Sequence, residues 1–260
     1  MRVLTWNVNS LRTRFERVLG VLERHQPDLL CLQETKVVDD QFPHEALKEA
    51  GYHAAAHGQK TYNGVALLSR EPLEEVESNF PGNPVAEEAR VISAKLGGIR
   101  FVDVYVINGK EVGSDKFVRK MAWLDALTAW LEGLIGAGEE VVVLGDWNIA
   151  PDDRDVHDPE KWRGKIHFSP EEHAKLAALT GLGLEDLFRR HHEEAGLFSW
   201  WDYRGGAFPR NQGLRIDYAL GTAGAAARCT GSSIDREERK KGDWEAKASD
   251  HAPVIFEFQA

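Results

Sequence analysis

Cysteine is scarce in this chain of 260 residues: it has two, Cys31 and Cys229, which are too few for a disulfide framework. Cys31 lies inside an apolar run, so we expect reduced thiols in a cytoplasmic protein. No apolar run is long enough to span a bilayer, and no signal-peptide pattern precedes the first apolar segment. We therefore expect a protein with no membrane partner.

The motifs of several enzyme classes are also missing. The chain has no His-Glu-x-x-His sequence and no cysteine pairs at zinc-finger spacing. It also lacks a phosphate loop, a dinucleotide-binding fingerprint and a Gly-x-Ser-x-Gly elbow. These absences argue against a zinc site and remove several competing enzyme classes.

An excess of positive charge is the third absence. The formal net charge is −10, whereas a general nucleic-acid binder is usually basic. An enzyme with a local basic face remains compatible with this charge. A cluster of metal-binding carboxylates would add negative charge without touching the surface that meets the substrate.

The most informative stretch present is residues 141–151, which read Val-Val-Val-Leu-Gly-Asp-Trp-Asn-Ile-Ala-Pro. Its four leading apolar residues are typical of a strand that is buried on both faces. Gly145 permits a close approach of the backbone, and Asp146 and Asn148 point to the same side at the end of the strand. Alone, this Asp-x-Asn pair is equally well explained by an Asx turn. The same arrangement recurs after other apolar runs, and that recurrence favours a functional site.

Apolar periodicity predicts a further set of strands at residues 2–8, 28–33, 65–69, 90–96, 99–107, 198–203, 214–220 and 254–258. It predicts helices after Ser10, over residues 114–135, and after Ser169, where Ser-Pro-Glu-Glu resembles a capping box. A strand-helix-strand crossover unit occurs in each half. The charged residues 236–247 predict a solvated loop. No low-complexity linker divides the chain, so residues 1–260 are expected to form a single domain.

Polar side chains gather in these predicted strands or at their ends. Each one alone can be a cap, a turn or a surface group. Together the carboxylates would repel one another unless a cation held them, because buried charges are normally paired or bound to metal. Oxygen-rich ligation indicates Mg²⁺, for which Mn²⁺ can substitute, rather than zinc. The residues in question are Asn7, Glu34, Tyr105, Asp146, Asn148, Asp217, Asp250 and His251.

Six short segments, in order along the chain, resemble the exonuclease III family of apurinic/apyrimidinic endonucleases, within the endonuclease/exonuclease/phosphatase superfamily. They are Trp6-Asn7-Val8-Asn9, Leu32-Gln-Glu34-Thr-Lys36, Thr61-Tyr-Asn-Gly-Val-Ala66, Gly145-Asp-Trp-Asn-Ile-Ala-Pro151, Gly213-Leu-Arg-Ile-Asp217-Tyr and Ser249-Asp-His-Ala-Pro253. The resemblance implies a DNase I-like, four-layered α/β sandwich: two mixed β-sheets packed face to face, with helices outside. It also implies that the site lies where the strand ends of both sheets meet.

The resemblance further implies a role for each residue. Glu34, with Asn7 and Asp250, would hold the divalent cation, which acts as a Lewis acid. Asp146, oriented by Asn148, would position or deprotonate the attacking water. His251 would donate to a phosphoryl oxygen, while Asp217 sets its tautomer. Tyr105 and Asn108 would contact the same phosphate.

Substrate selection is expected to involve other residues. By resemblance, Trp200, Leu214 and Ile216 would wall a small apolar pocket for an extruded sugar without a base. Ordinary core packing is the alternative explanation for these three residues. The candidates for contacts with DNA phosphates are Lys36, Lys60, Arg204, Arg210 and Arg215.

The sequence therefore predicts a Mg²⁺-dependent phosphodiesterase of DNA repair, acting as a monomer. It would incise duplex DNA 5′ to abasic sites, leaving a 3′-hydroxyl, and would trim blocked 3′ ends as exonuclease or phosphatase. One alternative is another superfamily enzyme with the same metal site, such as a phosphoinositide or sphingolipid phosphatase. A second is a DNA-binding relative with little or no catalysis, which would have no reason to retain a costly carboxylate cluster.

Overall fold

The computed structural model describes residues 1–242 and 245–259. Its centre is a pair of six-stranded mixed sheets. The first sheet has the order β11-β12-β1-β2-β4-β3, with strands β1 (Arg2–Asn7), β2 (Leu29–Gln33), β3 (His53–His57), β4 (Val65–Ser69), β11 (Cys229–Ile234) and β12 (Val254–Phe258). The second has the order β5-β6-β7-β8-β10-β9, with strands β5 (Glu74–Ser78), β6 (Val91–Leu96), β7 (Ile99–Tyr105), β8 (Val141–Asp146), β9 (Glu185–Asp186) and β10 (Asp217–Gly221).

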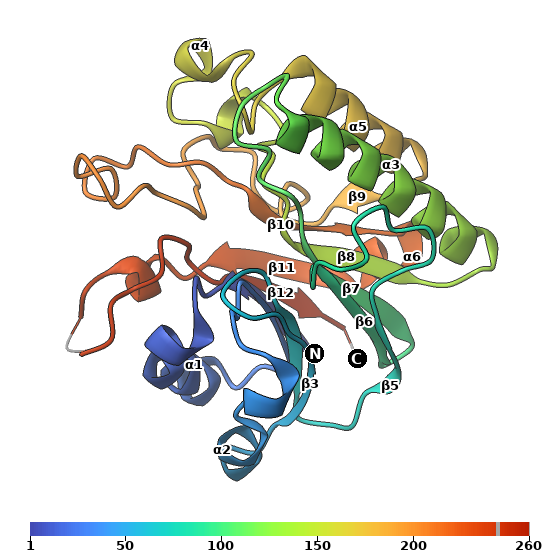
Figure 1. Ribbon diagram of the computed structural model, residues 1–260, viewed down its shortest axis with the longest axis vertical. Coiled ribbons are helices and arrows are strands. Elements are labelled where there is room, and N and C mark those ends of the chain that lie inside the picture. The colour runs from blue at the N-terminus through green and yellow to red at the C-terminus, as the bar shows by residue number, and fades with distance from the viewer. Residues whose placement is uncertain (243–244, 260) are drawn as a thin grey trace.

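Helices cover the outer face of each sheet (Figure 1). On the first sheet lie α1 (Leu11–His25) and α2 (His44–Glu49), and on the second lie α3 (Asp115–Gly136) and α5 (Pro170–Gly181). Shorter helices are α4 (Pro159–Trp162), α6 (Ala223–Arg228), η1 (Asp39–Gln41), η2 (Asp153–Asp155) and η3 (Arg236–Arg239). This arrangement confirms the predicted four-layered α/β sandwich. Among the described residues, no helix combines the length and hydropathy needed to cross a membrane.

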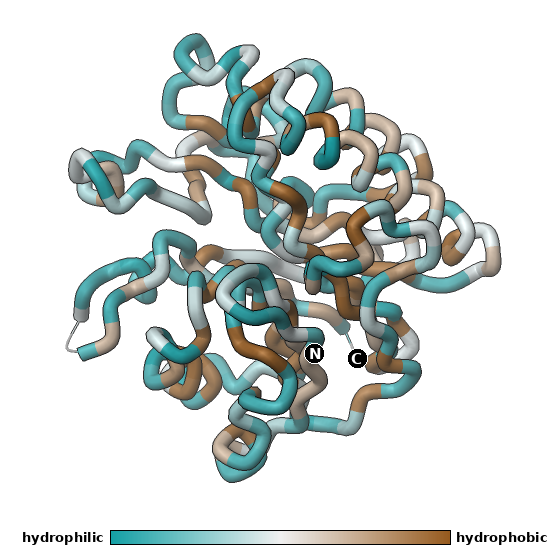
Figure 2. Tube along the Cα trace, in the orientation of Figure 1, coloured by the Kyte–Doolittle hydropathy of each residue, from teal (hydrophilic) through white to brown (hydrophobic). Residues whose placement is uncertain are grey.

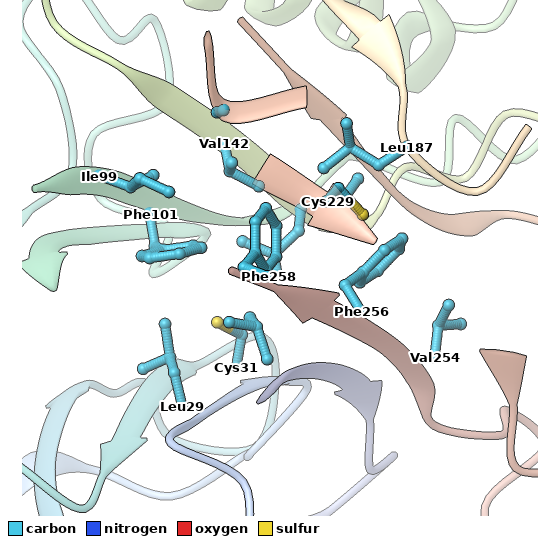
Figure 3. Packing of buried hydrophobic residues seen from close by; sticks show 14 of the residues in the cluster. Leu29, Cys31, Ile99, Phe101, Val142, Leu187, Cys229, Val254, Phe256 and Phe258 are labelled. Carbon is cyan, nitrogen blue, oxygen red and sulfur yellow. The ribbon is translucent and has the colours of Figure 1, made fainter. Parts of the chain in front are cut away.

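One apolar core lies between the two sheets. Figure 3 shows side chains of the first sheet facing those of the second, and Figure 2 shows hydrophobic residues following the strands. Burial of these apolar surfaces drives the pairing of the sheets. Residues of this core include Leu29, Cys31, Phe256 and Phe258 from the first sheet and Ile99, Phe101 and Val142 from the second.

Both predicted crossover units are present. In the first half, β1 and β2 are parallel and α1 connects them; in the second half, β7 and β8 are parallel and α3 connects them. The capping box at Ser169 and Glu172 is also confirmed, with Pro170 in the first turn of α5. Ser10 precedes α1 as predicted, but its side chain contacts the Thr13 hydroxyl instead of capping a backbone N–H.

Three predicted elements differ in the structure. Residues 198–203 are not a strand: Trp200 makes only isolated bridges, to Leu214 and to His251, because the backbone of this segment hydrogen-bonds to Leu214 and Asp250, which lie outside the sheets. The strand predicted from Leu214 begins at Asp217. The segment predicted as a solvated loop contains η3, whose Glu238 is buried against Arg17 of α1 at 2.8 Å. Residues 243 and 244 of that segment lie outside the described residues.

Candidate active site

Strand register brings the polar strand ends together. Asp146, the last residue of β8, pairs with Tyr105 of parallel β7 on one side and with Asp217 of antiparallel β10 on the other. In the facing sheet, Asn7 of β1 lies beside Gln33 of β2, and Glu34 follows directly. The buried apolar run of each strand places these polar ends at one edge of the sandwich. The structure therefore brings the side chains of this group together, and their roles stay predictions.

Asn7 links the two sheets through their carboxylates. Its Nδ2 donates to Glu34 Oε1 at 2.9 Å and to Asp146 Oδ2 at 2.8 Å. Its Oδ1 accepts from the Asn9 backbone N–H at 2.9 Å, so the amide presents nitrogen and not oxygen to the carboxylates. In this orientation Asn7 bridges the cluster, and its predicted role as a metal ligand stays a prediction. Glu34 also pairs with Lys36 at 3.0 Å.

A buried histidine–aspartate pair lies beside this cluster. His251 Nδ1 is 2.9 Å from Asp217 Oδ2, which also accepts from the Ser199 hydroxyl at 2.6 Å. His251 Nε2 lies 3.8 Å from Asp146 Oδ2. Burial alone would lower the pKa of His251, but the charges of Asp217 and Asp146 outweigh it and raise that pKa to about 10. The imidazolium is therefore a charged donor whose Nδ1 is held by Asp217.

Asp146 has the opposite environment. Burial, with the negative charge of Asp217 added to it, raises the pKa of Asp146 to about 7, although the His251 charge opposes this shift. Asp146 Oδ1 accepts from the Asn148 backbone N–H at 2.9 Å. Gly145 allows β8 to run close to β7, because a Cβ there would lie 2.0 Å from the Val104 carbonyl oxygen. The close approach predicted for Gly145 is thus confirmed.

The Asn148 and Asn108 side chains are joined directly. Asn108 Nδ2 donates to Asn148 Oδ1 at 3.1 Å, and Asn148 Nδ2 donates to the Val106 carbonyl at 2.9 Å. Tyr105 lies at the edge of the same group. Burial, followed by the charges of Glu34 and Asp146, raises the pKa of Tyr105 well above its usual value, so its hydroxyl keeps its proton.

Asp250 lies beside the site without belonging to its closest group of acidic and histidine ligands. Its carboxylate accepts from Asn9 Nδ2 at 3.0 Å and from Trp200 Nε1 at 3.1 Å. Burial would raise the pKa of Asp250, but the His251 charge and these two hydrogen bonds lower it. The predicted ligand role of Asp250 therefore remains a prediction.

The three residues predicted to form a sugar pocket have different environments. Leu214 and Ile216 are buried in a small cluster with Val156 and Phe168, and Trp200, which is half-buried and anchored to Asp250, packs against that same cluster. Trp200 therefore presents the more accessible surface of the three, and the alternative of core packing describes Leu214 and Ile216 better.

One of the predicted phosphate contacts is wrong. The Arg215 side chain is fully buried, where it pairs with Asp155 at 2.6 Å and with Asp186 at 2.7 Å. Its guanidinium also lies over the rings of Phe188 and Tyr218. Because each charge is satisfied inside the protein, Arg215 supports the fold and does not face DNA. Of the other candidates, Lys36 is half-buried, and the exposed ones are Lys60, Arg204 and Arg210.

The sequence profile of the Endonuclease/Exonuclease/phosphatase family matches residues 4–251. The chain belongs to this family. Exodeoxyribonuclease III of Haemophilus influenzae is 35% identical over the full length of both chains. A Neisseria 3′ phosphatase, solved with a product DNA hairpin, is 42% identical with a TM-score of 0.95, and an AP endonuclease of Archaeoglobus fulgidus is 34% identical with a TM-score of 0.93. Each alignment with a solved structure covers 100% of both chains.

Membership of the family confirms two predictions. The resemblance to exonuclease III extends over the full chain, and the fold is the one that these nucleases share. The chain is accordingly a hydrolytic nuclease of this family.

The donor set in this family member suits a hard divalent cation. Potential ligand atoms of Glu34, Asp146 and His251 lie within 4.8 Å of one another, but the protonated His251 ring has no lone pair to offer, which leaves the two carboxylates as ligands. Two of the three are carboxylates, the donors that Mg²⁺ and Mn²⁺ prefer. Asp146, which was predicted to act on water, is therefore also placed to share the metal.

Sequence reasoning missed a buried support beneath the site. Lys120 of α3 is fully buried, with its ammonium donating to the Asn148 carbonyl at 2.7 Å, to the Asn108 carbonyl at 3.3 Å, and to Glu172. The sequence does contain an indication that Lys120 is buried, because the residue lies on the apolar face of α3 that includes Phe117 and Leu124.

His167 was also missed, and no sequence pattern marks it. Its Nδ1 lies 2.7 Å from the Asn148 carbonyl and its Nε2 lies 3.5 Å from Asn108 Nδ2. Burial, and then the Lys120 charge, lower the pKa of His167 to about 4, so the ring is neutral. The neutral ring therefore donates from Nδ1 to the Asn148 carbonyl and helps to hold that residue.

Proposed function

We propose that this nuclease is a Mg²⁺-dependent DNA repair enzyme that breaks the bond between phosphorus and a 3′-oxygen in duplex DNA. At a blocked 3′ end this reaction removes a phosphate or a nucleotide; 5′ to an abasic site it nicks the strand. Every reaction leaves a 3′-hydroxyl. The observation that carries the proposal is the charged His251–Asp217 pair placed against the Glu34 and Asp146 carboxylates.

The side chains divide the work of an in-line displacement. Asp146 accepts the proton of the attacking water, and a pKa of about 7 suits a general base at neutral pH. Asn148 and Asn7 hold its two carboxylate oxygens in place. His251 donates to a non-bridging phosphoryl oxygen, whose charge grows as the bond breaks.

Glu34 and Asp146 would hold the cation, with His251 nearby. When bound, the metal supplies Lewis-acid stabilisation to the phosphate and to the departing 3′-oxygen. Tyr105 keeps its proton and can donate to the same phosphate. We further propose that the enzyme works as a cytoplasmic monomer and that residues 1–260 form one domain.

The direct test compares three substrates: a duplex with a 3′-phosphate, a duplex with one internal abasic analogue, and a soluble inositol phosphate. Each is incubated with Mg²⁺ and separately with EDTA. Hydrolysis of the DNA substrates with Mg²⁺ alone, yielding 3′-hydroxyl ends, supports the proposal. Preferential hydrolysis of the inositol phosphate would identify a phosphoinositide-type phosphatase, and DNA binding without hydrolysis would identify a binding relative.

His251→Asn should lower turnover by at least about a hundredfold, the usual scale for losing an electrostatic donor to a transition state. Asp217→Asn should lower it through the same unit, because Asp217 holds His251 Nδ1 at 2.9 Å. The double variant should therefore be little slower than His251→Asn alone. Turnover numbers at saturating 3′-phosphate substrate measure this, and multiplication of the two single effects would show that the residues act separately.

For incision at abasic sites, Trp200 is the residue proposed to contact the substrate. Its ring is half-buried beside Asp250, at the edge of the catalytic cluster, and the Archaeoglobus fulgidus relative is described as an AP endonuclease. An extruded sugar without a base can pack against such a ring, and its extrusion requires no base unstacking.

Trp200→Ala should therefore reduce abasic incision more than removal of a 3′-phosphate, which needs less apolar surface. The quantity to measure is the ratio of the two rates in the variant and the parent. Unfolding must be followed as well, since truncating a buried Trp costs about 3–5 kcal/mol in a core. Equal losses that follow the loss of stability would mean that Trp200 is a packing residue.

A further inference from the structure

Two loops lie beside the segment that carries Asp250 and His251. The first is residues 202–211, and the second is η3 together with Lys240 and Lys241. Figure 1 shows them as the orange and red loops that project on the same side of the molecule. They touch each other: Arg239 of the second loop lies over the Tyr203 ring of the first at 5.0 Å, and its Nη2 donates at 3.2 Å to the carbonyl of Trp201, which directly precedes the first loop.

Stacked side chains join the two loops into one unit. Arg236 lies over Trp201 at 5.1 Å and over Phe208 at 5.4 Å. Arg239 lies over Phe208 at 5.2 Å and over Tyr203 at 5.0 Å. Aromatic rings and guanidinium groups thus alternate. We call the five side chains the ladder; in order of contact they are Trp201, Arg236, Phe208, Arg239 and Tyr203. Cation–π contacts of this kind favour a fixed spacing between the loops.

A groove of about 370 Å³ runs along the ladder, lined by residues of both loops including Asp202, Tyr203, Phe208, Arg239, Lys240 and Lys241. Its lining has three cations and one carboxylate, and that carboxylate already pairs with Arg204 at 3.2 Å. Lys240 is paired with Glu237 at 2.6 Å. Among the described residues, Arg239 and Lys241 are then the cations of the lining without an ion pair, so the groove is locally positive although the chain has a net charge of −10.

Lys241 is the residue best placed to meet a ligand. Its backbone carbonyl accepts from Arg17 Nη2 at 2.6 Å, which ties its main chain to α1, while the residue itself is exposed. An anchored backbone with an exposed ammonium can bind an anion without first ordering a mobile loop.

The groove adjoins the segment that leads to the catalytic site. The Tyr203 hydroxyl donates to the Ala248 carbonyl at 2.8 Å, and Ala248 lies three residues before His251. Arg14 Nη2 reaches both the Tyr203 hydroxyl, at 3.1 Å, and the Ala248 carbonyl, at 3.4 Å. A polymer held in the active site would therefore have this groove at its flank.

We propose that the groove binds the phosphate backbone of DNA beside the cleavage site, with Lys241 contacting a phosphate and the ladder holding the two loops at the spacing that the strand requires. The inference rests on the proposed function and assigns it a partner surface. It follows from charge: DNA presents a dense row of phosphates, and contacts to them position the duplex without reading its sequence.

Salt dependence of binding tests the contact with Lys241. Each phosphate that a protein cation neutralises adds about 0.9 to the slope of log affinity against log salt for duplex DNA. Lys241→Gln should therefore reduce the slope of the parent by about 0.9, measured in EDTA so that no cleavage intervenes. Lys48→Gln is the matched control, because it removes the same charge from an exposed position on α2. Equal slopes for the two variants would overturn the proposal.

Truncating the duplex locates the contact. If Lys241 meets a flanking phosphate, shortening the duplex on one side of the cleavage site should abolish the difference between Lys241→Gln and the parent. A difference that survives truncation on either side would reflect general electrostatics and reject the groove.

Steady-state kinetics with Mg²⁺ test the groove independently of the proposed function. With Mg²⁺, Lys241→Gln should raise KM for long duplexes and leave kcat within about twofold, as expected for lost uniform binding. A fall in kcat with KM unchanged would contradict a flanking contact. If the parent protein hydrolyses no DNA, the proposed function fails, but the salt slopes still decide whether the groove binds DNA.

Discussion

Asp146→Asn should lower turnover on 3′-phosphate duplex DNA by about a thousandfold, within the range that a general base contributes. Asparagine keeps the shape of the side chain and can still accept from the Asn148 backbone N–H. It cannot take a proton from water, and it offers the cation a weaker ligand. Because burial raises the pKa of Asp146 to about 7, the native carboxylate resists ionisation in the folded protein. Its neutral replacement should therefore cost little stability beyond the lost hydrogen bond from Asn7 Nδ2.

The measurement is single-turnover cleavage with Mg²⁺, accompanied by thermal unfolding. Asp125→Asn is a suitable control, since that carboxylate lies exposed on α3 and pairs with Lys175 at 2.6 Å. It should leave cleavage unchanged. If Asp146→Asn kept activity within about tenfold of the parent, Asp146 would not be the general base, and another group would have to take the proton of water.

Lys120→Met should destabilise the protein by about 3–5 kcal/mol, the cost of leaving one partner of a buried ion pair uncompensated. Lys120 and Glu172 both have fully buried side chains, so the remaining carboxylate would lose its counter-charge without gaining water. The substitution also removes the donor to the Asn148 carbonyl at 2.7 Å, which helps to hold the backbone next to Asp146. Urea unfolding measures the loss.

Two comparisons make this prediction specific. Lys175→Met breaks an exposed pair with Asp125 and should cost less than about 1 kcal/mol. In Lys120→Met/Glu172→Gln the buried charge is gone, so much of the lost stability should return. That double variant should still turn over slowly, because the Asn148 carbonyl lacks its ammonium donor. A cost for Lys120→Met no larger than that for Lys175→Met would show that Lys120 contributes no more than a surface charge.

Several parts of the molecule follow from the sequence alone. Local patterns placed β1, β2, β4, β8 and β12 within a residue or two, because a short apolar run bounded by turn residues is itself a strand signal. The site could also be anticipated: Glu34, Asp146 and His251 each follow or precede such a run, and strand ends at one edge of a sandwich converge. Strands β3, β5 and β9 gave weaker signals, since β9 has only two residues and β5 is exposed throughout.

Side-chain direction in loops could not be read from the chain. Arg215 resembled a phosphate contact, yet it is buried between Asp155 and Asp186, which lie 60 and 29 residues away in sequence. Trp200 and Leu214 resembled strand residues, yet they lie in loops that bridge to each other outside the sheets. The sequence does not distinguish an arginine that binds a DNA phosphate from one that pairs with a carboxylate distant along the chain.

The sequence by itself determined the apolar runs, the caps and the set of chemically reactive groups, because these depend on neighbours within a few positions. Only the tertiary structure decided which charges face inward, as with Lys120 under Asn148, and which loops meet, as with Arg239 between Tyr203 and Phe208. The physical reason is that burial and Coulomb interactions act through space. A group's pKa and its availability to substrate depend on partners that the packing of the two sheets brings together.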